Sequence, residues 1–228
     1  MPFFVRPKEE DDLPVSKYFE DAGIGTIQFD PNAGVEDTLC FKHYNPSQMV
    51  LGRPMEEWLR FSPMFYHCFC GAGADPFGGP TIRRPWIDPE ATPMDNAKRT
   101  LRVAFEFYRR LGTQFFVFHD RHVAPEGQTL EESNANLDEI TDLMVELQKE
   151  SGVKVLWAAC NLFSHARYMN GAATNPDVHV VAYAAAQVKK GLEMAKKVGA
   201  ENFNLWGGRE GYQTLLNTDL KMELDHMA

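Results

Sequence analysis

The segment FFVFHDRHVAPEG, residues 115–127, joins a strand signal directly to a cluster of polar side chains. Its apolar run FFVF is followed at once by the polar residues HDRH, and Pro125 and Gly127 then interrupt regular structure. This order predicts a buried strand that ends at a surface and delivers polar side chains to it. The side chains that would reach that surface are those of His119, Asp120, Arg121 and His122.

Four segments of the chain have the composition of strands. The last three are nearly continuous apolar runs, which are typical of a sheet that is covered on both faces. The four expected strands are 65–69 (FYHCF), 114–119 (QFFVFH), 153–163 (VKVLWAACNLF) and 202–206 (NFNLW).

Apolar residues at steps of three and four predict helices between these strands. The expected helices cover 97–111, 137–147 and 181–195, and a fourth starts near Thr218 and Asp219 and reaches the last residue. Gly112 and Gly199 act as stop signals after the first and third helices. Thr129 and Glu132 have the spacing of a capping box ahead of the second.

This alternation of strand and helix predicts right-handed βα units and a parallel sheet. Functional residues are then expected at the C-terminal ends of the strands, where His119, Asn161 and Trp206 fall. Residues 1–60 show no clear periodicity and are expected to form an irregular arm over the edge of the domain, and residues 61–228 the βα domain itself.

The composition of the chain is that of a globular protein. A net charge of −9 argues against a nucleic-acid surface, since neutralising phosphates requires clustered Lys and Arg. No apolar stretch approaches the roughly 18 residues of a membrane-spanning helix, and the acidic N-terminus offers no secretory signal. The 4 cysteines are too unevenly spaced for a disulfide framework or a zinc site, so a reducing, cytoplasmic compartment is expected.

An ordered series of motifs from about residue 40 to the last residue resembles xylose isomerase, of the longer bacterial and plant type. The motifs are FKHYNP, VLGRPMEEWLRFS, GADPFG, FHDRHVAPEG, ESGVKVLW, GAATNPDVHV, AAAQVKK and LWGGREGYQTLLNTDL. The resemblance covers only the N-terminal half of that family. It implies an α/β fold that is half of a TIM-type barrel, with about four parallel βα units.

The resemblance also implies roles for single residues. His119 is similar to the family histidine that contacts the ring oxygen of the sugar and assists ring opening. Trp206 resembles the tryptophan that walls the sugar pocket, and Phe163 resembles a second apolar wall. Phe77, in the sequence DPFG, resembles the aromatic residue that a neighbouring subunit inserts into the pocket.

Three positions depart from the pattern of the family. His122 stands where the family has an aspartate that orients and polarises the histidine, and a second imidazole offers no fixed negative charge. Tyr66 stands where the family has a pocket tryptophan, and Ala159 where it has a threonine whose hydroxyl meets the substrate. Together these changes affect the acid–base, stacking and hydrogen-bonding parts of one pocket.

The family implies two divalent cations, Mg²⁺ or Mn²⁺, but the sequence suggests no place for them. The ligands of the family lie on strands five to eight, and this sequence ends at Ala228, in the helix after the fourth expected strand. Glu210 is a lone carboxylate, and Asp120 is expected to pair with a nearby arginine. His119 and His122 alone are a weak basis for a transition-metal site. No metal ligands are therefore predicted in this chain.

Two functions remain open on the sequence. The first is that of a xylose isomerase, truncated before its metal-binding half, that interconverts D-xylose and D-xylulose only if another chain supplies the metals. The second is a non-catalytic sugar-binding or assembly protein. In either case a xylose-like sugar is the expected ligand. A homo-oligomer that completes the barrel is expected as well, with Val117, Trp157 and Trp206 near the contact.

Overall fold

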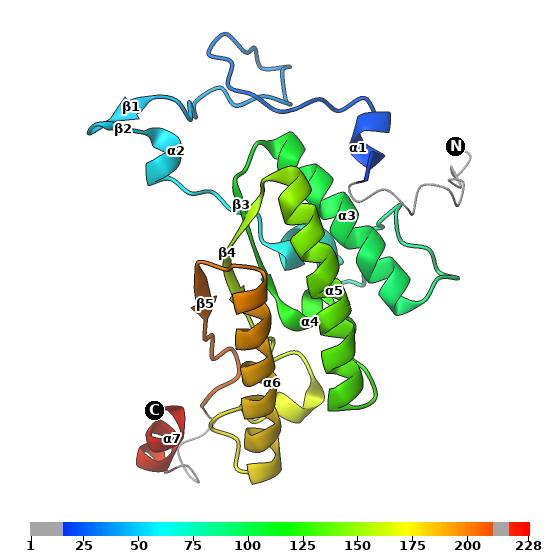
Figure 1. Ribbon diagram of the computed structural model, residues 1–228, viewed down its shortest axis with the longest axis vertical. Coiled ribbons are helices and arrows are strands. Elements are labelled where there is room, and N and C mark those ends of the chain that lie inside the picture. The colour runs from blue at the N-terminus through cyan, green and yellow to red at the C-terminus, as the bar shows by residue number, and fades with distance from the viewer. Residues whose placement is uncertain (1–15, 212–218) are drawn as a thin grey trace.

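The computed structural model describes residues 16–211 and 219–228. At its centre is a parallel three-stranded sheet with the order β3–β4–β5. Its strands are β3 (Phe115–His119), β4 (Lys154–Ala159) and β5 (Asn202–Asn204). All three fall within segments that the sequence predicts as strands, so a parallel α/β sheet is confirmed for this part of the chain (Figure 1).

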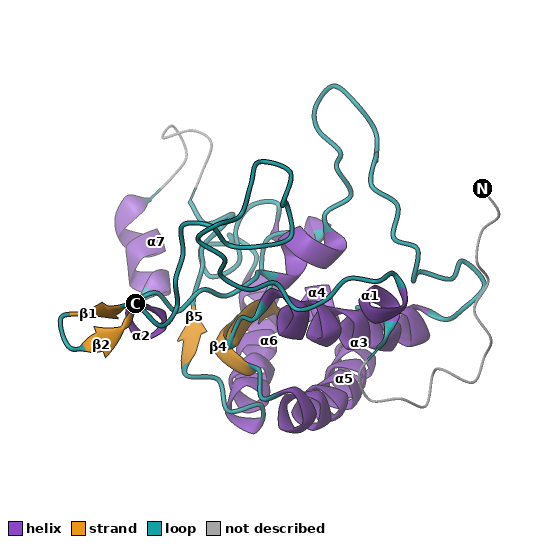
Figure 2. Cartoon of the chain, turned by 90° about the horizontal axis from the view of Figure 1, so that it is seen from above, coloured by secondary structure: helices purple, strands orange, loops and turns teal. Residues whose placement is uncertain are grey.

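Three long helices lie along one side of this sheet (Figure 2). They are α3 (Pro93–Leu111), α5 (Leu130–Ser151) and α6 (Val178–Lys197). Helix α5 lies between the other two and contacts both. The alternation of these helices with the strands is the expected βα pattern. This sheet has three strands in the described residues, so a half-barrel with four βα units stays a prediction.

The ends of the helices follow the predicted signals. Thr129 caps α5 by accepting a hydrogen bond from the backbone N–H of Glu132, as in the capping box. Helix α3 ends at Gly112, which takes the left-handed conformation with a φ of 72° that glycine adopts without steric cost. The last helix, α7 (Leu220–Met227), is capped by Asp219, while Thr218 lies outside the described residues.

The first expected strand, 65–69, is wrong. The chain there forms the π-helical turn η2 (Tyr66–Cys70), and only Met64 makes a parallel bridge, with Val117. The rings of Phe65 and Phe69 are both buried and lie 5.4 Å apart. Residues four apart in a strand are separated by about 13 Å, so a helical turn is what lets both rings enter one core. Burial of the two rings outweighs the β propensity of the segment.

Short elements make up the rest of the described chain. Before residue 61 they are α1 (Tyr18–Asp21), β1 (Met49–Val50), β2 (Arg53–Pro54) and α2 (Met55–Trp58), with β1 and β2 forming an antiparallel hairpin. The remaining two are α4 (Asp120–Val123) and the 3₁₀ turn η3 (Ala166–Tyr168). In Figure 1 the hairpin lies away from the helical layer. The division into an arm at 1–60 and a domain at 61–228 stays a prediction.

The core lies between the sheet and its helices. Phe116 and Phe118 of β3 are fully buried, and the ring of Phe116 lies 5.1 Å from the rings of both Phe105 and Tyr108 on α3. Burying one such aromatic side chain contributes about 1.5–3 kcal/mol. The outer edge of β3 is covered as well, because the N–H of Val117 donates to the carbonyl of Pro63. This core fixes the end of β3, where His119 begins the site.

In the described part of the chain, no helix is long and apolar enough to cross a membrane.

Candidate functional site

A pocket of about 340 Å³ opens at the C-terminal ends of the parallel strands. Its walls come from the segment before and within η2, from the end of β3 with α4, and from the loops after β4 and β5. It is lined by Met64, Tyr66, His67, His119, His122, Phe163, Ser164, Trp206, Gly208 and Arg209. The structure thus brings together five of the six residues that the sequence assigns to the site.

His119 is the last residue of β3 and is 3% exposed. Its imidazole makes edge contacts with the rings of Phe163, at 5.5 Å, and Trp157, at 5.7 Å. Burial lowers the pKa of His119 because it disfavours the imidazolium form, and nearby His67 lowers it further, while Asp120 acts in the opposite direction. The ring is therefore kept neutral in the physiological range.

His122 lies on α4, one turn beyond His119, and the two ring centroids are 5.0 Å apart. Its other face stacks obliquely on Tyr66, with 4.5 Å between the ring centroids. Burial, followed by the neighbouring His119 and His67, lowers the pKa of His122 to about 4. At neutral pH both imidazoles are thus uncharged, and they offer nitrogen donors and acceptors in place of a fixed charge.

Asn161 connects the end of β4 to this pair. Its Oδ1 accepts hydrogen bonds from the backbone N–H groups of Phe163, at 3.2 Å, and Ser164, at 2.9 Å. Its Nδ2 lies 3.0 Å from Nε2 of His122 and 2.9 Å from the hydroxyl of Ser164. Asn161 therefore fixes both the loop that carries Phe163 and the orientation of the His122 ring.

Asp120, which follows His119 in the chain, is fully buried and joins several segments around the site. Its carboxylate accepts hydrogen bonds from the backbone N–H groups of Arg121 and Asn161 and from the side-chain amide of Gln187, each at 2.7 Å. The hydroxyl of Tyr168 in turn donates to Oε1 of Gln187. The expected pairing of Asp120 with an arginine side chain is wrong: within the described residues, amide groups satisfy this carboxylate.

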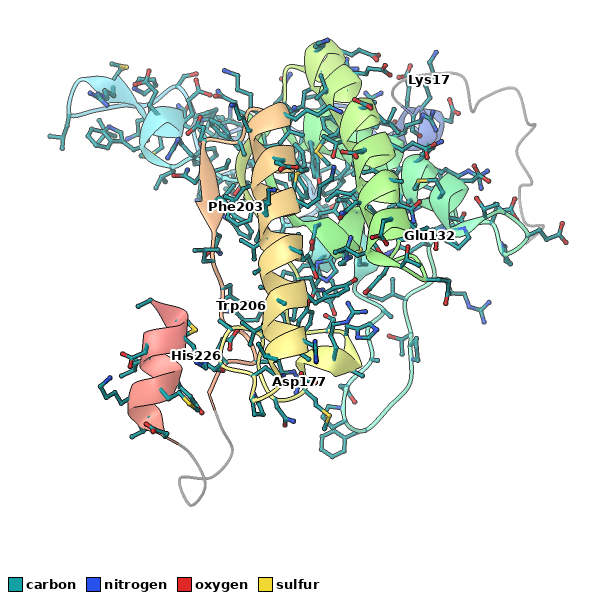
Figure 3. All side chains as sticks on the ribbon, turned by 60° about the horizontal axis from the view of Figure 1, so that its bottom comes forward. Lys17, Glu132, Asp177, Phe203, Trp206 and His226 are labelled. Carbon is teal, nitrogen blue, oxygen red and sulfur yellow. The ribbon has the colours of Figure 1, made fainter. Side chains whose placement is uncertain are left out.

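Two aromatic side chains form an apolar wall. The rings of Phe163 and Trp206 meet edge to face, with 4.5 Å between their centroids. Trp206 lies just after β5 (Figure 3). It is 52% exposed, so part of its ring is free to contact a ligand. Such a surface suits the C–H face of a sugar ring, while the imidazoles at the base of the pocket suit its hydroxyl groups.

Phe77 is not part of this pocket. It lies in the turn closed by hydrogen bonds between the backbone groups of Asp75 and Gly78, and it is 98% exposed. An aromatic ring this exposed contributes almost nothing to the core of its own chain. Its expected insertion into the pocket of a neighbouring subunit stays a prediction.

The donor set of the described residues does not fit a pair of divalent cations. These residues include no group of three or more His, Cys, Asp and Glu side chains placed to hold a metal ion. The lone carboxylate of Glu210 is occupied, since it accepts hydrogen bonds from the backbone N–H groups of Ala172, Ala173 and Thr174. Burial raises the pKa of Glu210, but these bonds together with one from the Thr174 hydroxyl outweigh it and lower the pKa, and they tie the loop after β5 to the loop before α6. Glu210 is a structural residue here.

The sequence reasoning does not identify five of the lining residues: Met64, His67, Ser164, Gly208 and Arg209. His67 adjoins Tyr66 in the segment that was expected to be a strand, where alternation would have turned the two side chains to opposite faces. Arg209 lies in the motif LWGGREG, but only its position in that motif could have suggested it. Asn161 was noted at a strand end, yet no local signal predicted its contact with His122.

Comparison with known proteins shows which sequences this chain resembles. No family model matches it. It is 52% identical over 212 residues to xylose isomerase from Caldicellulosiruptor bescii, covering 93% of this chain and 48% of that protein. It is 54% identical over 206 residues to the xylose isomerase of Hordeum vulgare, covering 90% of this chain and 43% of the relative. For that of Geobacillus kaustophilus the identity is 54% over 207 residues, covering 90% and 45%.

The chain thus spans about half the length of the curated relatives that it matches. Identity above half of all aligned positions, over nine tenths of this chain, establishes common descent with these proteins. By sequence, this chain belongs to the xylose isomerase family and corresponds to part of such a protein.

Proposed function

We propose that the pocket around His119 binds a cyclic aldose such as xylose, and that this chain is the sugar-binding part of a xylose isomerase. The observation that carries the proposal is the placement of His119, buried at a strand end, directly beside the aromatic wall of Phe163 and Trp206. Parallel α/β sheets bind their ligands at this end of the strands.

The chemistry of the lining supports a sugar as ligand. Aromatic faces bind the apolar side of a pyranose, and neutral imidazoles exchange hydrogen bonds with its oxygens. The lining includes one strongly basic residue, Arg209, and no carboxylate. The aligned relatives are named as xylose isomerases throughout, which gives the non-catalytic alternative no support of its own.

Catalysis, in contrast, needs more than this pocket. In the family, divalent cations assist the transfer of hydride between two carbons of the sugar, and the described residues contain no ligand set for them. We therefore propose that isomerisation requires metal-binding residues other than those described here, and that this chain alone binds sugar without converting it.

The first prediction concerns Trp206. The Trp206→Ala variant is expected to weaken xylose binding about twofold to tenfold, because a stacked aromatic ring contributes about 0.5–1.5 kcal/mol beyond its buried area. Binding is measured by following backbone amide NMR shifts during titration with xylose. Trp58→Ala is the matched control, since Trp58 is a similarly exposed tryptophan on α2 and does not line the pocket. Equal binding by the two variants, or no binding by the unmodified chain, contradicts the proposed site.

The second prediction concerns assembly. We propose that the chain forms a homo-oligomer through the edge of the sheet at β5, where Leu205 is 74% exposed and Trp206 is 52% exposed. Strand edges with apolar neighbours invite pairing with another chain. The expectation that Val117 lies near this contact is wrong. Val117 is 3% exposed, because the segment around Met64 already covers the β3 edge there.

Sedimentation velocity at micromolar concentration tests this assembly. The unmodified chain is expected to sediment as a dimer or a multiple of one. The Leu205→Glu variant is expected to shift toward monomer, since it places a charge in the contact. Leu51→Glu is the control, because Leu51 is 90% exposed on the distant hairpin. A monomer at all concentrations is the result that rejects the assembly.

A further inference from the structure

Arg209, at the wall of the pocket, has hydrogen-bond donors that its own chain does not use. Its Nε–H donates to the carbonyl of Phe163 at 3.2 Å. Within the described residues, no hydrogen bond or ion pair engages the two terminal NH₂ groups of this guanidinium. Arg209 is exposed and lines the pocket, so these NH₂ groups are available to a ligand there.

The backbone that carries Arg209 is fixed on both sides. The N–H of Glu210 closes a turn on the carbonyl of Gly207, and the Glu210 carboxylate is bound by backbone N–H groups of the loop before α6. The ring of Trp206 packs against Gly208, where an added Cβ atom would lie 2.7 Å from the ring. The turn therefore holds the guanidinium and the exposed Trp206 ring in the lining of one pocket.

No carboxylate in the lining neutralises this cation. Glu210 is the next residue in the chain, but its oxygens are occupied by backbone N–H groups. Asp120 is fully buried and lies outside the lining. His119 and His122 add no charge at neutral pH, because burial lowers the pKa of both rings. Arg209 therefore gives the pocket one permanent positive charge.

We propose that Arg209 binds the carboxylate of a sugar acid, so that this pocket prefers a cyclic uronic acid to a neutral aldose of the same ring. The two NH₂ groups of an arginine form parallel hydrogen bonds with the two oxygens of a carboxylate. They remain available because the carbonyl of Phe163 uses only Nε. A single cation matches a monoanion better than a phosphate dianion. The inference rests on the proposed function, since it places a sugar ring in the pocket.

A hexuronic acid has the parts that the lining would recognise. Its ring offers C–H groups to Phe163 and Trp206 and hydroxyl groups to His119, and its carboxylate projects from the ring edge. The pocket of about 340 Å³ is of the size that holds small molecules. The net charge of −9 opposes anions at long range, but salt screens exposed charges beyond about 8 Å, so the nearby guanidinium decides.

The experiment compares D-glucuronate with D-glucose, which carries CH₂OH in place of the carboxylate. Both are titrated into the full chain at about pH 7.5, above the ordinary pKa of histidine, and backbone amide NMR shifts are followed. Glucuronate is expected to bind about threefold to tenfold more tightly, between the effects of an exposed ion pair and of a hydrogen bond to a charged group. The preference is expected to shrink in about 0.5 M NaCl. Equal affinities at low salt overturn the inference.

Arg209 variants separate recognition of the anion from support of the loop. Arg209→Gln removes the charge and keeps a side-chain amide, and it is expected to weaken glucuronate binding more than glucose binding, so that the preference disappears. Arg209→Lys keeps the charge without the paired NH₂ groups and is expected to retain part of the preference. Arg53→Gln is the matched control, since Arg53 is an exposed arginine on β2 outside the lining. Equal weakening of both sugars by Arg209→Gln would mean that Arg209 only holds the Phe163 loop, and the inference would be wrong.

Further titrations distinguish this inference from the proposed function. Acetate binding as tightly as glucuronate would show an anion site that does not recognise a sugar, and tighter binding of glucose 6-phosphate would show a phosphate site. Either result overturns the inference. Binding of xylose or glucose without any preference for glucuronate rejects the role of Arg209 and leaves the sugar pocket standing. Failure of every sugar to bind rejects both.

Discussion

Purified chain incubated with xylose and either Mg²⁺ or Mn²⁺ is expected to form xylulose at least about a hundredfold more slowly than a xylose isomerase of ordinary length. Metal ions that polarise the reacting oxygens contribute several kcal/mol of barrier lowering, and about 2.7 kcal/mol is already a factor of a hundred in rate. The described residues offer no group of three or more ligands for such ions.

The assay compares this chain with the xylose isomerase of Geobacillus kaustophilus, a relative 54% identical to it, under identical metal and sugar concentrations. The His122→Asp variant is the second arm, and it is expected to remain inactive because it restores a carboxylate but no metal ligands. Turnover by the unmodified chain within a hundredfold of the relative would show that this chain carries every residue that metal-assisted catalysis needs. The proposal that isomerisation requires metal-binding residues other than those described would then be wrong.

Asp120→Ala is expected to destabilise the chain by about 2–6 kcal/mol, because each buried donor left without an acceptor costs about 1–3 kcal/mol and at least two lose theirs. This is a large part of the total stability of a typical domain. Asp120 is fully buried, and the variant leaves the backbone N–H of Asn161 and one N–H of the Gln187 amide without an acceptor, while the other N–H of that amide still donates to the carbonyl of Asn161. These groups lie just after β4 and on α6, so the variant removes hydrogen bonds that join these elements to the end of β3. The free energy of unfolding is measured by urea denaturation.

Two further variants serve as comparisons for the free energy of unfolding of Asp120→Ala. Asp120→Asn retains an oxygen for the backbone N–H groups and is expected to lose clearly less than Asp120→Ala. Asp138→Ala removes a side chain whose ion pair with Lys190 is exposed on the Asp138 side, and exposed pairs contribute at most about 1 kcal/mol. A loss for Asp120→Ala no greater than that for Asp138→Ala would mean that water replaces the carboxylate at no cost.

Local signals predicted the regular elements because those elements depend mainly on their own residues. The apolar runs at β3, β4 and β5 are long enough to identify a covered parallel sheet. The caps of α5 and α3 were readable because capping pairs a side chain with a backbone group only a few residues away. The cluster HDRH could be placed at a strand end for the same reason, since strand and loop adjoin in the chain.

The same local reasoning failed where residues remote in the sequence decide the local conformation or the hydrogen-bond partners. The segment 65–69 has strand composition, but the core beneath α3 accepts Phe65 and Phe69 together only from a helical turn. Asp120 lies next to an arginine in the chain, yet amide groups from β4 and α6 are closer to its carboxylate in space. In both cases the partner that decided the outcome is remote in sequence.

By itself, then, the sequence determined the parallel α/β layers, the position of His119 at the end of β3, and the family, because periodicity, caps and motifs are properties of the chain order. Only the tertiary structure decided how the ring of His122 is oriented and which groups surround it. Its ring is fixed by Asn161, which lies 39 residues away in the chain, and by the aromatic and imidazole rings around it. The physical reason is that the proton position on a buried imidazole depends on which partner atoms face its two nitrogens, and folding alone brings those atoms together.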